Sequence, residues 1–365
     1  MTYLNNSLGI EWSKEPKQFL KLQLDRQKDA MHIHLSNYID LMTVEEYQYK
    51  TLPAVFPHLK YDSLIPLPSD YSKLRKEYDQ HEQRTHVLIR DYQKLLGKLV
   101  YIIYRCRDEL AYAGHALASR QLTPDELDMF MLYHCYRHIK HTSKDSLIFR
   151  KANSFHLNII CDGSHMKHQP SGGITLGHHG FIITLGHCNI YTVSHPATRP
   201  CSSSTEDEAN AATKASNTYK MIRNTLSELS ITFDNQSIHY TDSNSMIKLI
   251  MRQIQVSNRA KHFANDLSVM KYLVKQHNMQ YFLTPTKQLP ADLLTKCNIP
   301  KGLQLDYMRQ IRDVKLFYVA MEQLGAINPK LLFGTHTKVV LFLEKFDDMQ
   351  LRSDDDELYE NELVP

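Results

Sequence analysis

Two aspartates stand at the ends of short apolar runs, where a sheet would deliver them to one of its edges. Asp162 ends one such run and Asp242 ends another. Runs of this length are typical of buried strands. Taken alone, Asp162 with Gly163 behind it is better explained as the first residue of a turn. The interpretation changes because two further acids, Glu208 and Asp292, lie on predicted helices that can reach the same edge.

Four carboxylates gathered at one point would repel one another unless cations lay between them. Carboxylate oxygens suit Mg²⁺, which keeps several of its waters and also binds substrate phosphates. Two such ions about 3.5–4 Å apart can activate a water and stabilise the leaving oxygen of a phosphodiester. We therefore expect a site for two Mg²⁺ ions, with Mn²⁺ as the alternative, formed by Asp162, Glu208, Asp242 and Asp292.

The elements that must position these acids lie between residues 155 and 296. Glycine-rich turns separate three strand-like runs, which predict an antiparallel meander. A helix with Ser204 or Thr205 as its cap follows, and acids fill its first turn. The expected elements are strands at 155–162, 180–186 and 188–195, a helix at 204–229, a strand at 237–242, helices at 243–255 and 260–277, a strand at 279–285 and a helix from 290. This order predicts an α/β domain that begins near residue 150.

The first 150 residues predict a mostly helical region behind a β-hairpin. Alternating apolar and polar residues place the hairpin at 7–24, with Pro16 in its loop. The prolines of residues 50–75 indicate a linker or an extended surface segment. Two long helices are expected, at about 83–118 and 123–141, the second with proline in its first turn.

Both of these helices carry basic side chains. They are Lys98, Arg105 and Arg107 on the first helix, and Arg137 and Lys140 at the end of the second. A basic helix end is ordinarily explained by the helix dipole and by solvation. It could also follow a phosphate backbone, although the residues alone favour the first explanation.

The amino-acid composition excludes few classes of protein. A net charge of +3 over 365 residues neither requires nor excludes nucleic acid as a partner. The six cysteines form no C-x-x-C pair, so we expect reduced thiols in an intracellular protein. No signal peptide and no transmembrane helix are expected, because the chain has no basic start followed by an apolar core and no run of 18 apolar residues. The acidic stretch 347–365 predicts a disordered tail.

Five ordered motifs resemble the ribonuclease H domain of copia-type (Pseudoviridae) LTR retrotransposon Gag-Pol polyproteins. They are CDGS (161–164), SSSTEDEANAA (202–212), TDSNSMIKLI (241–250), SNRAKHFANDL (257–267) and LTPTKQLPADLLTK (283–296). Upstream, residues 92–113 and RHIKHT (137–142) resemble the end of the family's reverse transcriptase. LGIEW (8–12) is similar to the segment that grips the primer. The resemblance covers about residues 7–296.

The resemblance implies an α/β fold with a ribonuclease H-like mixed sheet, in which three antiparallel strands precede parallel ones and helices flank them. It implies three parts: a primer-grip hairpin, thumb and connection-like region (1–150), a ribonuclease H domain (151–300) and a C-terminal extension (301–365). It further implies endonucleolytic cleavage of the RNA strand of RNA–DNA hybrids during reverse transcription. Asp162, Glu208, Asp242 and Asp292 would be catalytic residues and metal ligands.

The resemblance also implies contacts, partners and places in the cell. The residues expected to contact nucleic acid are Ser164, Ser243, Asn244, Arg259, Lys261, Lys98, Arg105, Arg107, Arg137 and Lys140. The RNA–DNA hybrid is the expected substrate, and a full-length reverse transcriptase or integrase of the same element is an expected partner. No membrane partner is expected. The expected locations are cytoplasmic virus-like particles and the nucleus.

The sequence departs from the family pattern at several points. The Tyr-x-Asp-Asp pair of the polymerase palm is absent, and residues 38–41 lack its second aspartate, so no polymerase activity is expected from this chain alone. Residues 284–288 lack the histidine that ribonucleases H often carry before the last aspartate. His165, His168, His178 and His179 are expected in surface loops. The alternative function is a catalytically idle, truncated remnant that binds nucleic acid or full-length polyprotein.

Overall fold

The computed structural model describes residues 16–43, 47–82, 84–151, 155–165, 176–231, 233–234, 236–251 and 264–323. The chain divides into two compact units, Met1–Phe317 and Tyr318–Pro365. Both hydrophobic clusters of the described chain belong to the first unit. The finer division at residues 150 and 300 stays a prediction. The acidic tail 347–365 lies outside the described residues.

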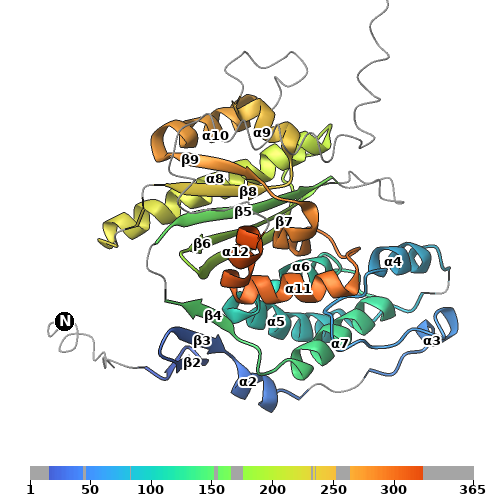
Figure 1. The fold of residues 1–365 in the computed structure, drawn as a ribbon. Helices are drawn as coiled ribbons and strands as arrows, with labels where there is room; N and C mark the ends of the chain where they lie inside the picture. The colour runs from blue at the N-terminus through green and yellow to red at the C-terminus, as the bar shows by residue number, and fades with distance from the viewer. Residues whose placement is uncertain are drawn as a thin grey trace, which may run out of the picture. The chain divides into compact units, whose positions relative to one another are not determined.

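A five-stranded mixed sheet confirms the expected fold class (Figure 1). Its strands are β5 (Leu157–Ser164), β6 (His178–Leu185), β7 (Cys188–Pro196), β8 (Ser237–Thr241) and β9 (Met279–Leu283). They lie in the order β7-β6-β5-β8-β9, with the first three antiparallel and with β8 and β9 parallel to β5. Because β5 and β8 are parallel neighbours, both deliver their following residues to one edge of the sheet.

Three helices accompany this sheet. They are α8 (Ser204–Glu228), α9 (Asn244–Met251) and α10 (Ala264–His277). Ser203, rather than Ser204 or Thr205, caps α8, since its side chain accepts a hydrogen bond from the backbone N–H of Glu206. The small residues Ala211 and Ala215 are fully buried, and they let α8 pack closely against the apolar face of the sheet.

A second, antiparallel sheet begins the described chain. Its strands are β1 (Gln18–Phe19), β2 (Leu22–Arg26), β3 (Ala30–His34) and β4 (Leu147–Arg150), in that order. The expected single hairpin strand over residues 18–24 is wrong, because the chain turns at Leu20 and Lys21, whose φ angles are 48° and 68°. The first strand of that expected hairpin lies outside the described residues.

Helices fill the chain between β3 and β4. They are α2 (Ser36–Leu41), α3 (Leu52–Val55), α4 (Tyr71–Asp79), α5 (Ile89–Cys106), the 3₁₀ helix η1 (Asp108–Leu110), α6 (Ala111–Ala118) and α7 (Glu126–His141). The expected surface linker at 50–75 is wrong, since Ile65, Leu67 and Tyr71 are buried and α3 and α4 form there. The second expected helix is confirmed as α7, with Asp125 and Asp128 forming a capping box at its start.

The expected continuous helix at 83–118 is broken at Arg107. Asp108 is the reason, because its carboxylate accepts hydrogen bonds from Asn189 Nδ2 at 3.1 Å and from Thr192 Oγ1 at 2.9 Å, both on β7. Arg107 beside it is fully buried and pairs with Glu109 at 2.6 Å. The chain leaves the α5 axis in order to satisfy these buried polar groups.

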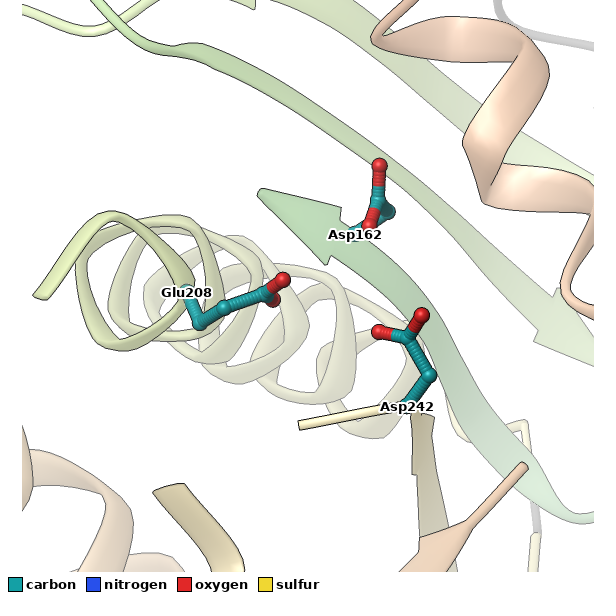
Figure 2. A group of neighbouring side chains, drawn as sticks. All are labelled: Asp162, Glu208 and Asp242. Atoms are coloured by element: carbon teal, nitrogen blue, oxygen red, sulfur yellow. The ribbon is translucent and has the colours of Figure 1, made fainter. Parts of the chain in front are cut away.

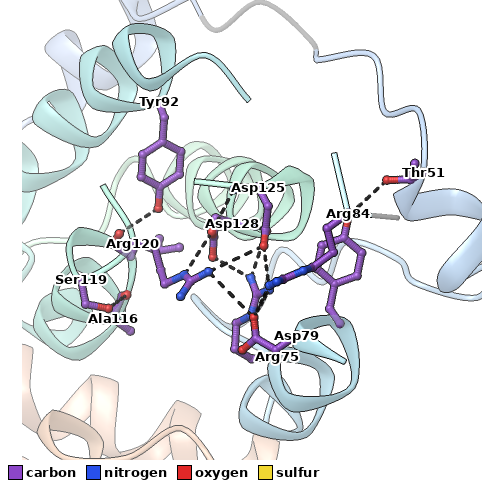
Figure 3. Close-up of polar contacts among 12 residues, drawn as sticks. Thr51, Arg75, Asp79, Arg84, Tyr92, Ala116, Ser119, Arg120, Asp125 and Asp128 are labelled. Carbon is purple, nitrogen blue, oxygen red and sulfur yellow. Dashed lines mark hydrogen bonds and ion pairs between the residues drawn. The ribbon is translucent and has the colours of Figure 1, made fainter. Parts of the chain in front are cut away.

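An ion-pair network ties α4 to the start of α7 (Figure 3). Arg75 lies 2.7 Å from Asp125 and 3.0 Å from Asp128, and both aspartates are fully buried. Arg84 pairs with Asp79 at 2.8 Å, where both side chains are about a third exposed. Arg75, whose side chain is 12% exposed, therefore neutralises the capping box of α7 together with Arg120, whereas Arg84 adds a surface pair.

The chain after β9 consists of short helices. They are the 3₁₀ helices η3 (Thr286–Gln288) and η4 (Pro290–Leu294), followed by α11 (Lys301–Arg312) and α12 (Val314–Gln323). The helix expected from Pro290 is instead a single 3₁₀ segment, and a separate helix begins at Lys301.

Candidate metal centre

Three of the four predicted acids meet at one edge of the mixed sheet. Asp162 lies in the last part of β5, Asp242 directly follows β8, and Glu208 projects from the second turn of α8. One oxygen of each carboxylate lies within 4.8 Å of the others. Figure 2 shows the side chains of Glu208 and Asp242 directed toward one another, with Asp162 beside them. The expected juxtaposition of two strand-end aspartates and a helix glutamate is therefore present.

Glycine at position 163 lets α8 approach the end of β5. Its backbone N–H donates a 3.1 Å hydrogen bond to Oε2 of Glu208. A Cβ at this position would lie 2.8 Å from the backbone oxygen of Asp207, closer than side chains pack. The turn expected directly after Asp162 is therefore wrong, because Gly163 lies within β5 and pairs with β6, and this glycine serves the close approach of α8.

Two threonine hydroxyls hold the aspartates. Thr286 Oγ1 donates a 2.8 Å hydrogen bond to Oδ2 of Asp242, and Thr295 Oγ1 donates one to Oδ2 of Asp162. Sequence reasoning missed both threonines, although both lie in the quoted motif at 283–296.

The fourth acid joins the group through a lysine. Asp292 lies in η4 and is 4% exposed. Its Oδ1 lies 3.0 Å from Nζ of Lys296, and the same Nζ lies 3.9 Å from Oδ2 of Asp162. Sequence reasoning also missed Lys296, although its spacing of four residues from Asp292 is the spacing at which helical side chains meet.

Burial and like charge act together on the acids. Burial, and then the charges of Asp162 and Asp242, raise the pKa of Glu208 well above its usual range. Burial and Asp162 likewise raise the pKa of Asp242, and they raise that of Asp292 to about 8, against the opposing charge of Lys296. A buried cluster of hard oxygen donors that is costly to ionise on its own fits a divalent cation.

The expected nucleic-acid contacts near the acids have structural partners of their own. Ser164 Oγ lies 3.3 Å from the carbonyl of Thr295. Ser243 is 9% exposed, and its hydroxyl accepts a 3.4 Å hydrogen bond from the N–H of Met246 at the start of α9. Asn244 beside it is half-buried. The predicted residues Arg259 and Lys261 lie outside the described part of the chain.

The basic residues of the helical region divide into two groups. Arg107 is fully buried beside Glu109, and Lys140 donates to the backbone carbonyl of Asp40 at 3.1 Å. The expectation that Arg107 contacts a phosphate is therefore wrong, because its guanidinium is enclosed by protein, and Lys140 serves as a cap for α2. In the other group, Lys98 is half-buried, and the guanidinium groups of Arg105 and Arg137 lie over the rings of Tyr101 and Tyr61 at 5.2 and 4.1 Å.

The histidines expected in surface loops fall in three environments. His178 and His179 lie in β6 and are buried, which contradicts that expectation. Burial lowers the pKa of His178 to about 2 and that of His179 to about 3. His165 is 41% exposed and pairs with Asp207. His168 lies outside the described residues.

Comparison with known proteins confirms the resemblance to copia-type polyproteins. No protein-family model matches the chain. Its homologues include the Transposon Ty1-JR2 and Ty1-MR1 Gag-Pol polyproteins of Saccharomyces cerevisiae, each 27% identical over 234 residues. These alignments cover 62% of this chain and 13% of each relative. The chain thus spans about an eighth of the length of the polyproteins it matches.

Two solved ribonuclease H structures also align with the chain. One is LC11-RNase H1 isolated from compost, 16% identical with a TM-score of 0.30, covering 40% of this chain and 98% of that one. The other is the N-terminal RNase H domain of rv2228c from Mycobacterium tuberculosis, 12% identical with a TM-score of 0.29, covering 43% and 98%. The Ty1 homologues relate the chain to retrotransposon Gag-Pol polyproteins. Among the described helices, none combines the length and apolarity needed to cross a membrane.

Proposed function

We propose that this chain is a metal-dependent endonuclease that cuts the RNA strand of RNA–DNA hybrids during retrotransposon reverse transcription. The observation that carries the proposal is the meeting of Asp162, Glu208 and Asp242 within 4.8 Å at the end of two parallel strands. The Ty1 homologues support the context of a polyprotein.

The four acids would hold two Mg²⁺ ions, or Mn²⁺ in their place. Asp162 and Asp242 would contact both ions, Glu208 would hold the ion on the leaving-group side, and Asp292 would complete the second position. The ions, when bound, would supply an activated water and charge stabilisation at the leaving oxygen. The protein's own part is to fix the ligands: Thr286 and Thr295 each hold one aspartate oxygen.

Recognition of the hybrid would use the RNA 2′-hydroxyl in the minor groove. Asn244, at the start of α9 and close to Asp242, is the better placed of the two predicted α9 contacts, because Ser243 is turned into the protein. Lys98, Arg105 and Arg137 remain the proposed phosphate contacts of the helical region. Their side chains are exposed or half-exposed.

The proposed partners are the hybrid itself and a full-length reverse transcriptase or integrase of the same element. The proposed locations are cytoplasmic virus-like particles and the nucleus. We expect no primer extension by this chain alone, because the polymerase palm motif is absent from its sequence. Primer extension by the purified chain would contradict this part of the proposal.

A labelled RNA–DNA hybrid with Mg²⁺ tests the proposal. The wild type should cut the RNA strand, Asp162→Asn should lose at least about 100-fold of the rate, and Asp306→Asn should cut like the wild type. Asp306 is the matched control because it is exposed on α11 and pairs only with Arg309 at the surface. A folded wild-type chain that binds the hybrid without cutting it would overturn the proposal and favour the idle remnant.

A further inference from the structure

Lys296 places a positive charge inside the acidic cluster. Its Nζ lies 3.0 Å from Oδ1 of Asp292 and 3.9 Å from Oδ2 of Asp162. Both aspartates are almost fully buried, whereas the lysine side chain is 33% exposed. The ammonium therefore bridges the strand β5 to η4 through their acids, and it reaches this position from the solvent side.

A metal beside Asp292 would need carboxylate oxygens of the same two aspartates. Thr295 already donates to Oδ2 of Asp162, and the lysine occupies Oδ1 of Asp292. An ammonium and a divalent cation cannot both lie within bonding distance of one carboxylate oxygen without strong repulsion. Filling the position beside Asp292 therefore requires the ammonium to move.

The Lys296 side chain is able to move, because a third of it is exposed to solvent. Its four-carbon aliphatic chain is flexible and its charge is concentrated on one ammonium group, unlike the planar, delocalised guanidinium of arginine. It also lines a small cavity together with Glu109 and Gln304. Glu109 is charged, because its arginine neighbours Arg107 and Arg312 overcome the effect of burial and lower its pKa. Glu109 thus adds a further negative charge beside the cavity that Lys296 lines.

We propose that Lys296 is a positioning residue whose ammonium takes the place of a metal ion between Asp292 and Asp162 until a divalent metal displaces it. The lysine preserves the arrangement of the acids in the metal-free protein, and it sets the metal concentration at which the position beside Asp292 fills. This inference rests on the proposed function, because it takes the acids to be metal ligands.

Calorimetric titration of the full chain with Mn²⁺ alone, without nucleic acid, tests the inference. Lys296→Met should bind Mn²⁺ at the weaker position about fivefold more tightly than the wild type, because no ammonium competes. Lys296→Arg retains a cation and should bind no more tightly than the wild type. Lys287→Met is the control: Lys287 lies in the neighbouring η3, is exposed, and should leave Mn²⁺ binding unchanged.

Thermal unfolding in a chelator gives a second readout that does not depend on cleavage. The midpoint of Lys296→Met should fall below that of the wild type and of Lys287→Met, and saturating Mg²⁺ should remove most of the difference. Equal or weaker Mn²⁺ binding by Lys296→Met, or an unchanged midpoint in the chelator, would overturn the inference. If the wild type still cuts hybrids in that case, the proposed function stands. A wild type that neither binds Mn²⁺ nor cuts would overturn both.

Discussion

The hydroxyl of Thr286 donates a 2.8 Å hydrogen bond to Oδ2 of Asp242, across a separation of 44 residues. Thr286 opens the 3₁₀ helix after β9, and its carbonyl accepts a 2.6 Å hydrogen bond from the hydroxyl of Tyr307 on α11. The rotamer of a strand-end aspartate is therefore set by a loop that α11 holds in place. This chain of contacts makes Thr286 a test of how the site is oriented.

Replacing Thr286 by valine should reduce hybrid cleavage about tenfold or more, because Asp242 loses the hydrogen bond that orients it. The Mg²⁺ concentration for half-maximal cleavage should rise with it. Thr225→Val is the control, since Thr225 is exposed on α8 and only bonds the backbone of its own helix. Cleavage and Mg²⁺ dependence equal to the wild type would show that Asp242 is oriented without the threonine.

Replacing Gly163 by alanine should destabilise the protein by about 1–3 kcal/mol, because the new methyl would meet the backbone of α8. Metal binding should weaken as Glu208 is pushed away from the aspartates. Gly97→Ala is a matched control in the exposed face of α5, where nothing lies within 4 Å of the added carbon. It should stabilise the protein by about 0.5–1 kcal/mol through helix propensity alone. Urea unfolding measures both, and similar effects from the two alanines would refute the close approach of α8.

Without metal, the protein should lose stability as the pH rises from about 7 to 8.5. Burial and the charge of Asp162 raise the pKa of Asp292 to about 8, above its unfolded value of 3.8. A carboxyl group whose pKa is higher in the folded than in the unfolded protein stabilises the fold fully at a pH below its unfolded-state pKa. This stabilisation is lost as the pH rises through the pKa of the folded state. The pKa values of the buried His178 and His179 are lowered, so these histidines change stability only below about pH 6.5 and do not contribute between pH 7 and 8.5.

The measurement is the unfolding midpoint in a chelator at pH 7 and at pH 8.5. Mg²⁺ should abolish the fall, and Asp292→Asn should reduce it because the titrating group is gone. A midpoint that is constant or rises over this range in the wild type would mean that Asp292 ionises normally.

Replacing Arg75 by methionine should cost up to about 3 kcal/mol of unfolding free energy, because the buried Asp125 and Asp128 would lose their shorter ion pairs and keep those with Arg120, at 3.7 and 3.3 Å. Arg84→Met should cost less than about 1 kcal/mol, since its pair with Asp79 is partly exposed. Chemical denaturation of both variants checks the contrast that Figure 3 illustrates. Equal losses would show that burial does not distinguish the two arginines.

From its apolar runs, the sequence predicted the strands that carry Asp162 and precede Asp242. Through its resemblance to a known family, it predicted the mixed sheet that brings the two aspartates together. It could not predict the break at Arg107. The apolar periodicity continues through that residue, and the cause lies more than 80 residues away in the contacts of Asp108 with β7. Lys296 was missed for the same reason, since its partner Asp162 is fixed by the fold and not by spacing. The burial of His178 and His179 likewise depends on elements packed from elsewhere in the chain.

The strand β7 is the edge of the mixed sheet, and its neighbours on that side come from upstream. Asp108 accepts its hydrogen bonds, and α6 and β4 lie against it. A product that started after residue 150 would remove the Asp108 carboxylate from Asn189 and Thr192, and it would open a strand edge to pairing with other chains. Light scattering of such a product beside the full chain would measure that tendency. More scattering from the shorter product would show that covering the edge strand β7 is one task of the upstream region.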